Sequence, residues 1–548
     1  MAIDTAEPAG SVRPQTRLRA ALTNAALPAA LLFLGTLLLY WNTRTSANTF
    51  DAVSYANQIA HLYPRTGDPH WLFHPHHLLF NALGYVLWRS ASVLGYRGGP
   101  LVVLQSLNAM LGASGVVLYY FTLRRLLQRS HGLPLLISLG LALSFGWWIC
   151  ATDGRVNMPS IFLMLAAFAA LTRTMTTPRV SLAALTGALA GGAVLFHESA
   201  GLFVAVGLAG VLLSPAPWAQ RRQLALAYLA AWGLTAALPY LVVGVLVLHL
   251  YSLSAFHAWS AEYTELGWWW DFRIGRNLGL DCHAFLHAGF AEPDIRASAR
   301  MQGLYGISAA GGLAAAFLIL AMLPQLWRSH SRSLVVVLAV WIFMYSAFFT
   351  VWSPGYFVFW VPALVPASTL LALTLAHYRA RRGGRVVNWL LGSWIVVSGA
   401  LNLQAGILPH LPPMSDPFRR IAADVRAHTP RGDAVLVAGA GDGGPCEVAL
   451  PYFADRDVIS LHGLLTKKRD DKTAALALAQ SEITAALASG HAAYALDEVI
   501  PTHNEKTLAA LAARHGLTDD DLKTLLSPYV RTLAWQSPRG PVWRLMGK

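Results

Sequence analysis

Long apolar runs separated by short polar segments dominate the first three-quarters of the chain. As helices, most of these runs are long enough to cross a bilayer core of about 30 Å. We therefore predict a polytopic α-helical membrane protein with about eleven transmembrane helices, the first an uncleaved anchor rather than a signal peptide. The predicted spans are residues 19–41, 100–123, 133–152, 157–173, 181–196, 200–213, 224–250, 303–327, 333–351, 357–377 and 386–408.

One further apolar stretch, residues 77–96, is interrupted by Asn81, Arg89 and Ser90. Cytoplasmic loops collect Lys and Arg, because these side chains resist translocation. If 77–96 does not cross the membrane, every arginine-rich short loop lies on the same side as the N-terminus. If it does cross, the pattern fails. We therefore predict a cytoplasmic N-terminus and an amphipathic helix at 77–96 along the outer interface.

Composition agrees with a membrane protein. Hydrophobic residues make up 55% of the chain and charged residues 13%, whereas soluble proteins carry roughly 25% charged residues. The net charge of +13 arises without a dense Lys/Arg face, so nucleic acid is not an expected partner. The three cysteines, Cys150, Cys282 and Cys446, lack metal-site spacing. A Cys282–Cys446 disulfide and three separate thiols both stay open.

The acidic residues between Glu7 and Ser415 all fall on one predicted side of the membrane. In the predicted topology each lies outside or at the outer end of a helix, and carboxylates near lipid are usually functional. We expect any chemistry on this outer face, which comprises a first loop (42–99), a second loop (251–302) and the tail. The acids are Asp51, Asp68, Asp153, Glu198, Glu262, Glu265, Asp271, Asp281, Glu292 and Asp294.

The tail after Pro409 is predicted to be a small α/β domain on the outer side. Helical patterns and short strand-like apolar runs alternate after a proline-rich linker. The expected elements are a helix at 417–428, strands at 434–438 and 458–461, and helices at 473–488 and 505–514. The chain thus divides into a cytoplasmic tail (1–18), a transmembrane region (19–410) and the α/β domain (415–548).

Asp51 and Asp153 are the leading candidates for catalysis. Asp51 follows the first span closely, where a carboxylate could act as a general base on an acceptor hydroxyl. Its alternative role is at a helix start, because Asn48 and Thr49 favour one there. Asp153 and Arg155 share the short loop after the third span, where arginine could grip a phosphate with its planar fork. A capped turn with a local ion pair is the alternative.

Several histidines are candidate substrate-binding residues. His197 and Glu198 follow a small-xxx-small helix face at Gly187 and Gly191. Burying them unpaired would be expensive, so they are paired, metal-bound or lining a wet cavity. A second group, expected at headgroup level rather than on a metal, consists of His74, His76 and His77.

Two other segments suggest ligand contacts. Residues 268–271, Trp-Trp-Trp-Asp271, with Arg273 and Arg276 could fold over a lipid phosphate or form an interfacial aromatic belt. Residues 439–444 match G-x-G-x-x-G, but the following Pro445 opens a helix poorly. We interpret them as a glycine-rich turn and not as a dinucleotide site.

The order of these features resembles the GT-C superfamily of membrane glycosyltransferases, in particular its family 39-like branch of protein O-mannosyltransferases and aminoarabinose transferases. The resemblance lies in an acid in the first outer loop (Asp51), surface helices over roughly 57–96, an acid after the third span (Asp153) and His197-Glu198 between two short helices. It extends over the whole chain and includes the segment Trp352–Trp360. The first loop departs from the mannosyltransferases in having a single Asp instead of an Asp-Glu pair.

The resemblance implies a transferase reaction at the outer face. The donor would be a sugar linked to a polyprenyl phosphate, and the acceptor a lipid, glycan or protein. Asp51 would deprotonate the acceptor hydroxyl in one inverting displacement, while Arg155, Arg273 and Arg276 stabilise the leaving phosphate. No cofactor is obligatory. A divalent cation, Mg²⁺ or Mn²⁺, bridging Asp51 and Asp153 is used by some relatives and not by others.

The implied location is the bacterial inner membrane, with the C-terminal domain periplasmic or extracellular. The competing hypothesis is a transporter or lipid flippase, which would need polar residues inside the spans and an internal repeat. A non-catalytic scaffold would explain the tail but not the recurrent outer acids. Because the acids lie on one side and no repeat is seen, the sequence favours an enzyme.

Overall fold

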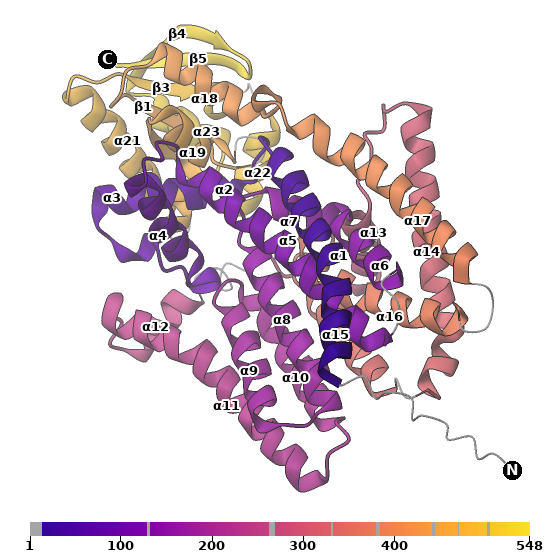
Figure 1. Ribbon diagram of the computed structural model, residues 1–548. Coiled ribbons are helices and arrows are strands. Elements are labelled where there is room, and N and C mark those ends of the chain that lie inside the picture. The colour runs from indigo at the N-terminus through magenta and orange to yellow at the C-terminus, as the bar shows by residue number, and fades with distance from the viewer. Residues whose placement is uncertain are drawn as a thin grey trace, which may run out of the picture.

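The computed structural model describes residues 14–128, 132–261, 269–329, 332–379, 384–440, 444–468, 471–500 and 505–548. They form a bundle of long helices with an α/β region at one end (Figure 1). Among the positions singled out in the sequence, Glu262, Glu265, Trp268 and residues 441–443 of the glycine-rich turn lie outside the described residues.

Eight helices in the described part of the chain are long and apolar enough to cross a membrane. Each coincides with a predicted span, and the chain is therefore a multi-pass membrane protein. The helices are α1 (Pro14–Asn42), α5 (Pro100–Leu127), α8 (Asn157–Thr176), α11 (Trp218–Val242), α14 (Ala299–Trp327), α15 (Arg332–Phe349), α16 (Val361–Arg379) and α17 (Gly384–Leu401).

The other three predicted spans are not straight helices of membrane length. Residues 133–152 form α6 (Gly132–Ala142) and α7 (Phe145–Thr152), which meet at a bend of 63° and count as one span at most. Residues 181–196 and 200–213 form α9 (Val180–Val194) and α10 (Phe203–Leu212), which are too short. The prediction of about eleven spans is thus corrected to eight, or nine with the bent pair, among the described residues. Hydropathy detects apolar content but not a local break, which explains the error.

The break between α6 and α7 is stabilised by two buried side chains. A broken helix leaves carbonyl groups without partners. Nδ2 of Asn402 donates to the Leu143 carbonyl at 2.7 Å, and the Tyr40 hydroxyl donates to the Ala142 carbonyl at 2.8 Å. Both side chains are fully buried. They fix the direction of α7. Asp153 follows the last residue of this helix.

The helices α9 and α11 pack with their backbones in contact. A Cβ atom on Gly191 would lie 2.6 Å from the Trp232 carbonyl oxygen, and one on Gly187 would overlap the Tyr228 carbonyl oxygen. Only glycine allows this approach. The small-xxx-small packing face predicted from the sequence is confirmed.

The two loops that are predicted to lie on the outer side form several short helices. The first loop forms α2 (Phe50–Asn57), α3 (Tyr63–Thr66) and α4 (Phe80–Val93). The predicted amphipathic helix at 77–96 is therefore a helix over its central part, and its place at the interface stays a prediction. The second loop forms α12 (Leu253–Ser260) and α13 (Ile274–Gly289).

The C-terminal region is a five-stranded mixed sheet with helices, in the strand order β2-β1-β3-β5-β4. Strand β1 pairs in parallel with β2 and β3, whereas β5 is antiparallel to β3 and β4. The predicted strands and helices all form, but β3, the β4–β5 hairpin, α19, α20 and α23 were not predicted, and α19 begins directly after Pro445, which was expected to open a helix poorly. The elements are α18 (Pro417–His428), β1 (Ala434–Val437), α19 (Cys446–Ala449), η11 (Leu450–Ala454), β2 (Asp457–Ser460), α20 (Leu461–Lys467), α21 (Lys472–Ala488), β3 (Ala493–Leu496), α22 (Glu505–His515), α23 (Asp519–Leu526), β4 (Tyr529–Ser537) and β5 (Gly540–Gly547).

The close packing of α9 on α11 predicts opposite effects for two neighbouring substitutions. Gly191→Ala would force the helices apart, at a cost of about 1–3 kcal/mol. Gly192→Ala, in the same helix, would place its Cβ 3.8 Å from Leu163 and gain up to about 1 kcal/mol of helix propensity. We expect a lower melting temperature in detergent for Gly191→Ala only; equal melting temperatures for the two variants would contradict this packing.

Candidate active site

Asp51 lies in the first turn of α2 and has free carboxylate oxygens. The helix is capped by Thr49, whose Oγ1 accepts from the Ala52 backbone N–H at 3.5 Å. Asp51 is therefore not needed as the cap. Its side chain is exposed and has no hydrogen bond or ion pair to any described residue. A carboxylate in this state can accept a proton from a bound hydroxyl group.

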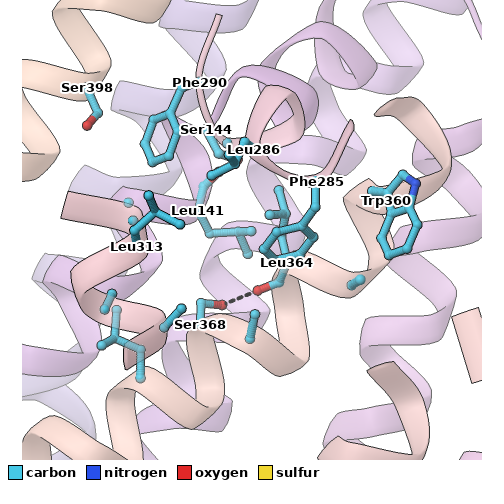
Figure 2. Close-up of a pocket in the computed structure, with 18 of the residues that line it drawn as sticks. Leu141, Ser144, Phe285, Leu286, Phe290, Leu313, Trp360, Leu364, Ser368 and Ser398 are labelled. Atoms are coloured by element: carbon cyan, nitrogen blue, oxygen red, sulfur yellow. Dashed lines mark hydrogen bonds between the residues drawn. The ribbon is translucent and has the colours of Figure 1, made fainter. Parts of the chain in front are cut away.

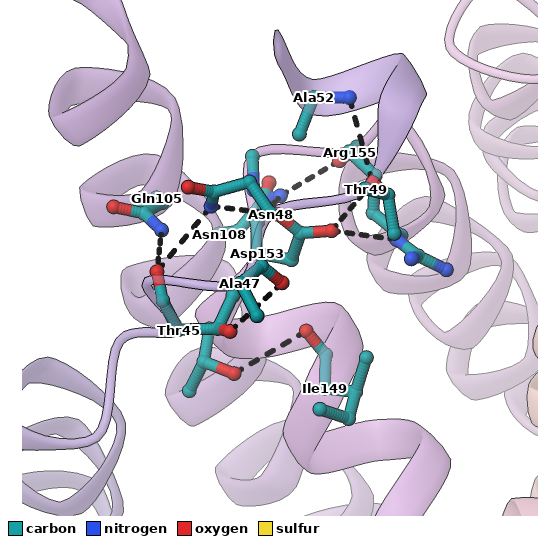
Figure 3. A network of polar contacts seen from close by, with 12 residues as sticks. Thr45, Ala47, Asn48, Thr49, Ala52, Gln105, Asn108, Ile149, Asp153 and Arg155 are labelled. Carbon is teal, nitrogen blue, oxygen red and sulfur yellow. Dashed lines mark hydrogen bonds and ion pairs between the residues drawn. The ribbon is translucent and has the colours of Figure 1, made fainter. Parts of the chain in front are cut away.

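Asp153, by contrast, is buried and its oxygens are already bonded. It is 1% exposed. Its Oδ1 accepts from the Gly154 backbone N–H at 2.8 Å and from Asn48 Nδ2 at 3.2 Å. Its Oδ2 accepts from Thr49 Oγ1 at 2.7 Å and from Arg155 Nε at 3.1 Å (Figure 3). These bonds join the start of α2 to the loop after α7.

Two amide side chains of α5 donate hydrogen bonds to the backbone of the same loops. Asn108 is fully buried, and its Nδ2 donates to the backbone carbonyls of Asp153 and Arg155, both at 2.7 Å. Gln105 Nε2 donates to the Thr45 carbonyl at 2.9 Å. Neither amide was predicted from the sequence to belong to the site. The only signal for them was a polar residue within an apolar run.

Arg155 is 4% exposed and uses only Nε in binding Asp153. Its Nη1 and Nη2 atoms make no hydrogen bond to the described residues, and in Figure 3 the end of the guanidinium group points away from the Asp153 cluster. Two parallel N–H donors in this arrangement match the oxygens of a phosphate. The local ion pair between Asp153 and Arg155, given above as the alternative to phosphate binding, is present at 3.1 Å.

The charges around Asp51 influence one another. Desolvation by the surrounding protein raises the pKa of the Asp51 carboxyl, Arg155 lowers it, and the Asp153 carboxylate raises it, with a net increase. Tyr356 belongs to the same group. Arg155 lowers the pKa of Tyr356, but burial and the Asp51 carboxylate raise it more. The sequence analysis noted the segment containing Tyr356 without giving this residue a role.

The structure brings the two predicted histidine groups together. Nδ1 of His76 lies 2.5 Å from Oε1 of Glu198. The rings of His74 and His77 stack with centroids 4.5 Å apart. His197 faces Ser199, with 2.8 Å between Nδ1 and Oγ. Glu198 and the histidines thus form one cluster between the first loop and the start of α10.

This cluster adjoins the helix that carries Asp51. Tyr55, one turn after Asp51 on α2, meets the ring of His77 edge-on with centroids 4.5 Å apart. Burial and, to a smaller extent, the neighbouring histidines lower the pKa of His74 to about 3 and that of His77 well below its ordinary value. These two imidazoles are therefore neutral at pH 7.

Asp271, Arg273 and Arg276 bind one another and not the Asp51 site. Arg273 forms a two-point ion pair with Asp271, with bonds of 2.8 and 2.6 Å, and Arg276 lies 3.5 Å from the same carboxylate. Both arginines are largely exposed. Their segment pairs with the stretch before Tyr356 through an antiparallel bridge between Trp270 and Trp352.

An apolar cavity of about 490 Å³ lies between α6, α13, α14, α15, α16 and α17 (Figure 2). At one end Asp281 accepts a 2.6 Å hydrogen bond from the Thr350 hydroxyl, and its other oxygen is buried without a hydrogen-bond partner among the described residues. The segment from Thr350 to Trp360 contributes to this cavity and also carries Tyr356. Lining residues include Leu141, Ser144, Phe285, Leu286, Phe290, Leu313, Leu364 and Ser398.

The cysteines and the carboxylates do not form a metal site in the described chain. Cys150, Cys282 and Cys446 are separate thiols. No group of three or more His, Cys, Asp or Glu residues among those described could hold a metal ion. Since Asp153 already accepts four hydrogen bonds, the residues present do not fit a cation bridging Asp51 and Asp153, and no reaction step is assigned to one.

Solved structures of membrane enzymes are similar to this chain over most of its length. ArnT from Cupriavidus metallidurans, bound to undecaprenyl phosphate, aligns with a TM-score of 0.56 at 14% identity over 94% of this chain and 97% of ArnT. Apo ArnT gives 0.57 at 14% identity over 95% and 98%. The Archaeoglobus fulgidus oligosaccharyltransferase with Zn and sulfate gives 0.47 at 14% identity, over 96% of this chain and 73% of that one.

No protein-family model matches the chain, and no curated protein matches it. The likeness is thus one of three-dimensional structure, and at this identity it concerns the fold. The chain has the fold of ArnT.

Proposed function

We propose that the protein transfers a sugar from a polyprenyl-phosphate donor to an acceptor hydroxyl, with Asp51 as the general base. One contrast carries the proposal: of two neighbouring aspartates, Asp153 has both oxygens bonded, whereas Asp51 has both free among the described residues and interacts electrostatically with Arg155. A free carboxylate close to a guanidinium group that can bind a phosphate is suited to this reaction. The GT-C fold supports the same assignment.

The proposed reaction is a single displacement at the anomeric carbon. Asp51 takes the proton of the acceptor hydroxyl as its oxygen forms the new glycosidic bond. The bond from the anomeric carbon to the phosphate oxygen breaks, and both of its electrons leave with the polyprenyl phosphate. Because attack is from the side opposite the leaving group, the anomeric configuration inverts. The phosphate is a good leaving group, so no strong general acid is needed.

Arg155 is proposed to bind the phosphate of the donor. Its acidic neighbours, Tyr356 first and then Asp153 and Asp51, raise its pKa more than burial lowers it, so the group stays charged. Asp153 fixes Nε and thereby the plane of the guanidinium. The two Nη atoms then face the charge that develops on the leaving phosphate, and such preorganised donors lower the barrier. Arg273 and Arg276, which bind Asp271 instead, are left out of the mechanism.

The apolar cavity is proposed to hold the hydrocarbon chain of the donor. Four of the helices around it, α14, α15, α16 and α17, are of membrane-spanning length, and Tyr356 and the cavity residue Trp360 belong to the same short segment. A donor could thus place its chain among α6, α14, α16 and α17 and its phosphate near Arg155. ArnT, which has the same fold, was crystallised with undecaprenyl phosphate.

The histidine cluster is proposed to bind the sugar. It is adjacent to α2, one turn beyond Asp51, and neutral imidazoles can both donate to and accept from hydroxyl groups. The His76–Glu198 pair would orient one of these rings. We place the site at the periplasmic face of a bacterial inner membrane, following the arginine distribution. A lipid, glycan or protein could each provide the acceptor hydroxyl.

Replacing the proposed base tests this mechanism. Asp51→Asn keeps the size of the side chain but removes proton acceptance, so kcat should fall about 10²–10⁴-fold. The measurement is release of polyprenyl phosphate by purified protein from a polyprenyl-phosphate sugar with acceptors supplied. Asp68→Asn, an exposed acid of the same loop, is the control and should stay active. Full activity of an equally stable Asp51→Asn variant would refute the role of Asp51.

The raised pKa of Asp51 predicts the pH dependence of turnover. Only the ionised carboxylate accepts a proton, so kcat/KM should rise as the pH rises through the pKa of Asp51. This pKa should be higher than the ordinary aspartate value of about 3.9. Arg155→Gln removes the cation that lowers this pKa. The acid limb of the profile should therefore move to higher pH, beside a loss of kcat. Arg97→Gln, an exposed change in the same loop, should leave the limb in place.

Filling the cavity should discriminate between donors by chain length. Ser398 lines the cavity, and its hydroxyl is buried without a partner among the described residues. Ser398→Leu should raise KM for a long polyprenyl donor about tenfold, equivalent to about 1.4 kcal/mol, and leave KM for a short-chain donor unchanged. Val396→Leu, exposed on the same helix, is the control. An equal change for both donors would place the chain elsewhere.

A further inference from the structure

The C-terminal region reaches the candidate active site through one arginine. Arg419 lies in the first turn of α18, whose N-terminus is capped by Asp416. Its Nη2 donates to Oδ1 of Asn48 at 2.6 Å, across 371 residues of sequence. Its guanidinium also lies 4.5 Å above the ring centre of Phe453. A charged group of the α/β region thus ends on the loop that precedes α2.

Asn48 is hydrogen-bonded to both Arg419 and Asp153. While its Oδ1 accepts from Arg419, its Nδ2 donates to Oδ1 of Asp153 at 3.2 Å and to the Thr45 carbonyl at 3.3 Å. The orientation of the amide is fixed, because a flipped amide would turn its NH₂ group to the guanidinium and its oxygen to the carboxylate. Asn48 therefore connects a cation of one region to a buried carboxylate of the other.

The connection continues to the proposed reacting groups. Asp153 binds Arg155 through Nε and binds Thr49, the cap of α2, through Oγ1. Asp51 follows Thr49 by two residues. A rotation of the Asp153 carboxylate would therefore change both the direction of the Arg155 guanidinium and the start of the helix that carries Asp51.

Other contacts also join the two regions. Arg65 binds Asp455 at 2.9 Å, and the Leu101 backbone N–H donates to the Tyr452 hydroxyl at 3.3 Å. Tyr452 also packs with the apolar patch of α2 and α5. Arg419, by contrast, has a buried Nε without a partner among the described residues. Such a group costs free energy, and docking alone does not require it.

We propose that Arg419 is a positioning residue, through which the C-terminal region orients Asp153 and with it Arg155 and Asp51. The catalytic part of this inference rests on the proposed glycosyl transfer. The positional part does not, because it concerns the order of two loops. The α/β region would then complete the active site instead of only covering it.

Hydrogen exchange measures the positional part in the full-length protein. The Gly154 N–H, bonded to Oδ1 of Asp153 at 2.8 Å, reports on the carboxylate. In Arg419→Ala and in Asn48→Ala, exchange should become faster in segments 45–56 and 148–157 and stay unchanged around Arg65. Arg420→Ala, an exposed neighbour on α18, is the control and should match the parent. Arg419→Lys, which keeps one donor, should lie between the parent and Arg419→Ala.

Kinetics measure the catalytic part. Arg419→Ala should lower kcat about tenfold or more, with a much smaller change in KM for the donor, because the loss is in orientation and not in binding. The double variant Asn48→Ala/Arg419→Ala should be no slower than the slower single variant, since residues of one network are not additive. The acid limb of the pH profile should also move, which general destabilisation would not cause.

Three results would overturn the inference. Exchange in Arg419→Ala equal to that in Arg420→Ala would show that Arg419 does not order the loops. Faster exchange also around Arg65 and Asp455 would make Arg419 a docking residue. Multiplying effects of the two single substitutions on kcat would show that they act independently. If the parent transfers no sugar, the proposed function fails, and the exchange data still decide the positional part.

Discussion

The buried carboxylate of Asp153 imposes the constraint on which the rest of the site depends. A carboxylate that is 1% exposed is stable only when its oxygens are bonded to donors. Here the donors come from the loop after α1, from the first residues after α7, and from Arg155. Satisfying one buried charge therefore fixes several segments of chain against each other. Asp51 and the Nη atoms of Arg155 take no part in these hydrogen bonds.

The segment from Thr350 to Trp360 takes part in both the charged site and the apolar cavity. Tyr356 lies among Arg155, Asp51 and Asp153, while Thr350 and Trp360 line the apolar cavity. A substrate with a long hydrocarbon chain and a charged phosphate has the same division. The fold thus offers a place for each half of such a molecule, with the reacting carbon expected where the two halves join.

The sequence predicted the parts of this site better than their connections. Local patterns are visible in one sequence. They predicted the aspartates of the first loop and of the turn after α7, and in the tail the strands β1 and β2 and the helices α18, α21 and α22. The bend between α6 and α7 depends on Asn402, which is distant in the chain. The contact of Arg419 with Asn48 spans 371 residues. Neither has a periodicity or a motif, so neither could be predicted without the fold.

The wrong number of predicted spans also shows what a sequence pattern cannot predict. Hydropathy found every apolar segment, including α9 and α10, but it could not show that these helices are too short to count as spans. Their shortness has a structural result, because it leaves Glu198 and His197 beside the first loop. The marginal length of both runs was the signal in the sequence, and the pairing of Glu198 with His76 required the structure.

The anomeric configuration of the product tests the central claim most directly. Purified protein would be given a polyprenyl-phosphate sugar of known configuration with a simple alcohol as acceptor, and the glycoside formed would be examined by NMR. A single displacement assisted by Asp51 predicts a product of inverted configuration only. A product of retained configuration would contradict the account, because it requires a covalent intermediate that a lone general base does not form.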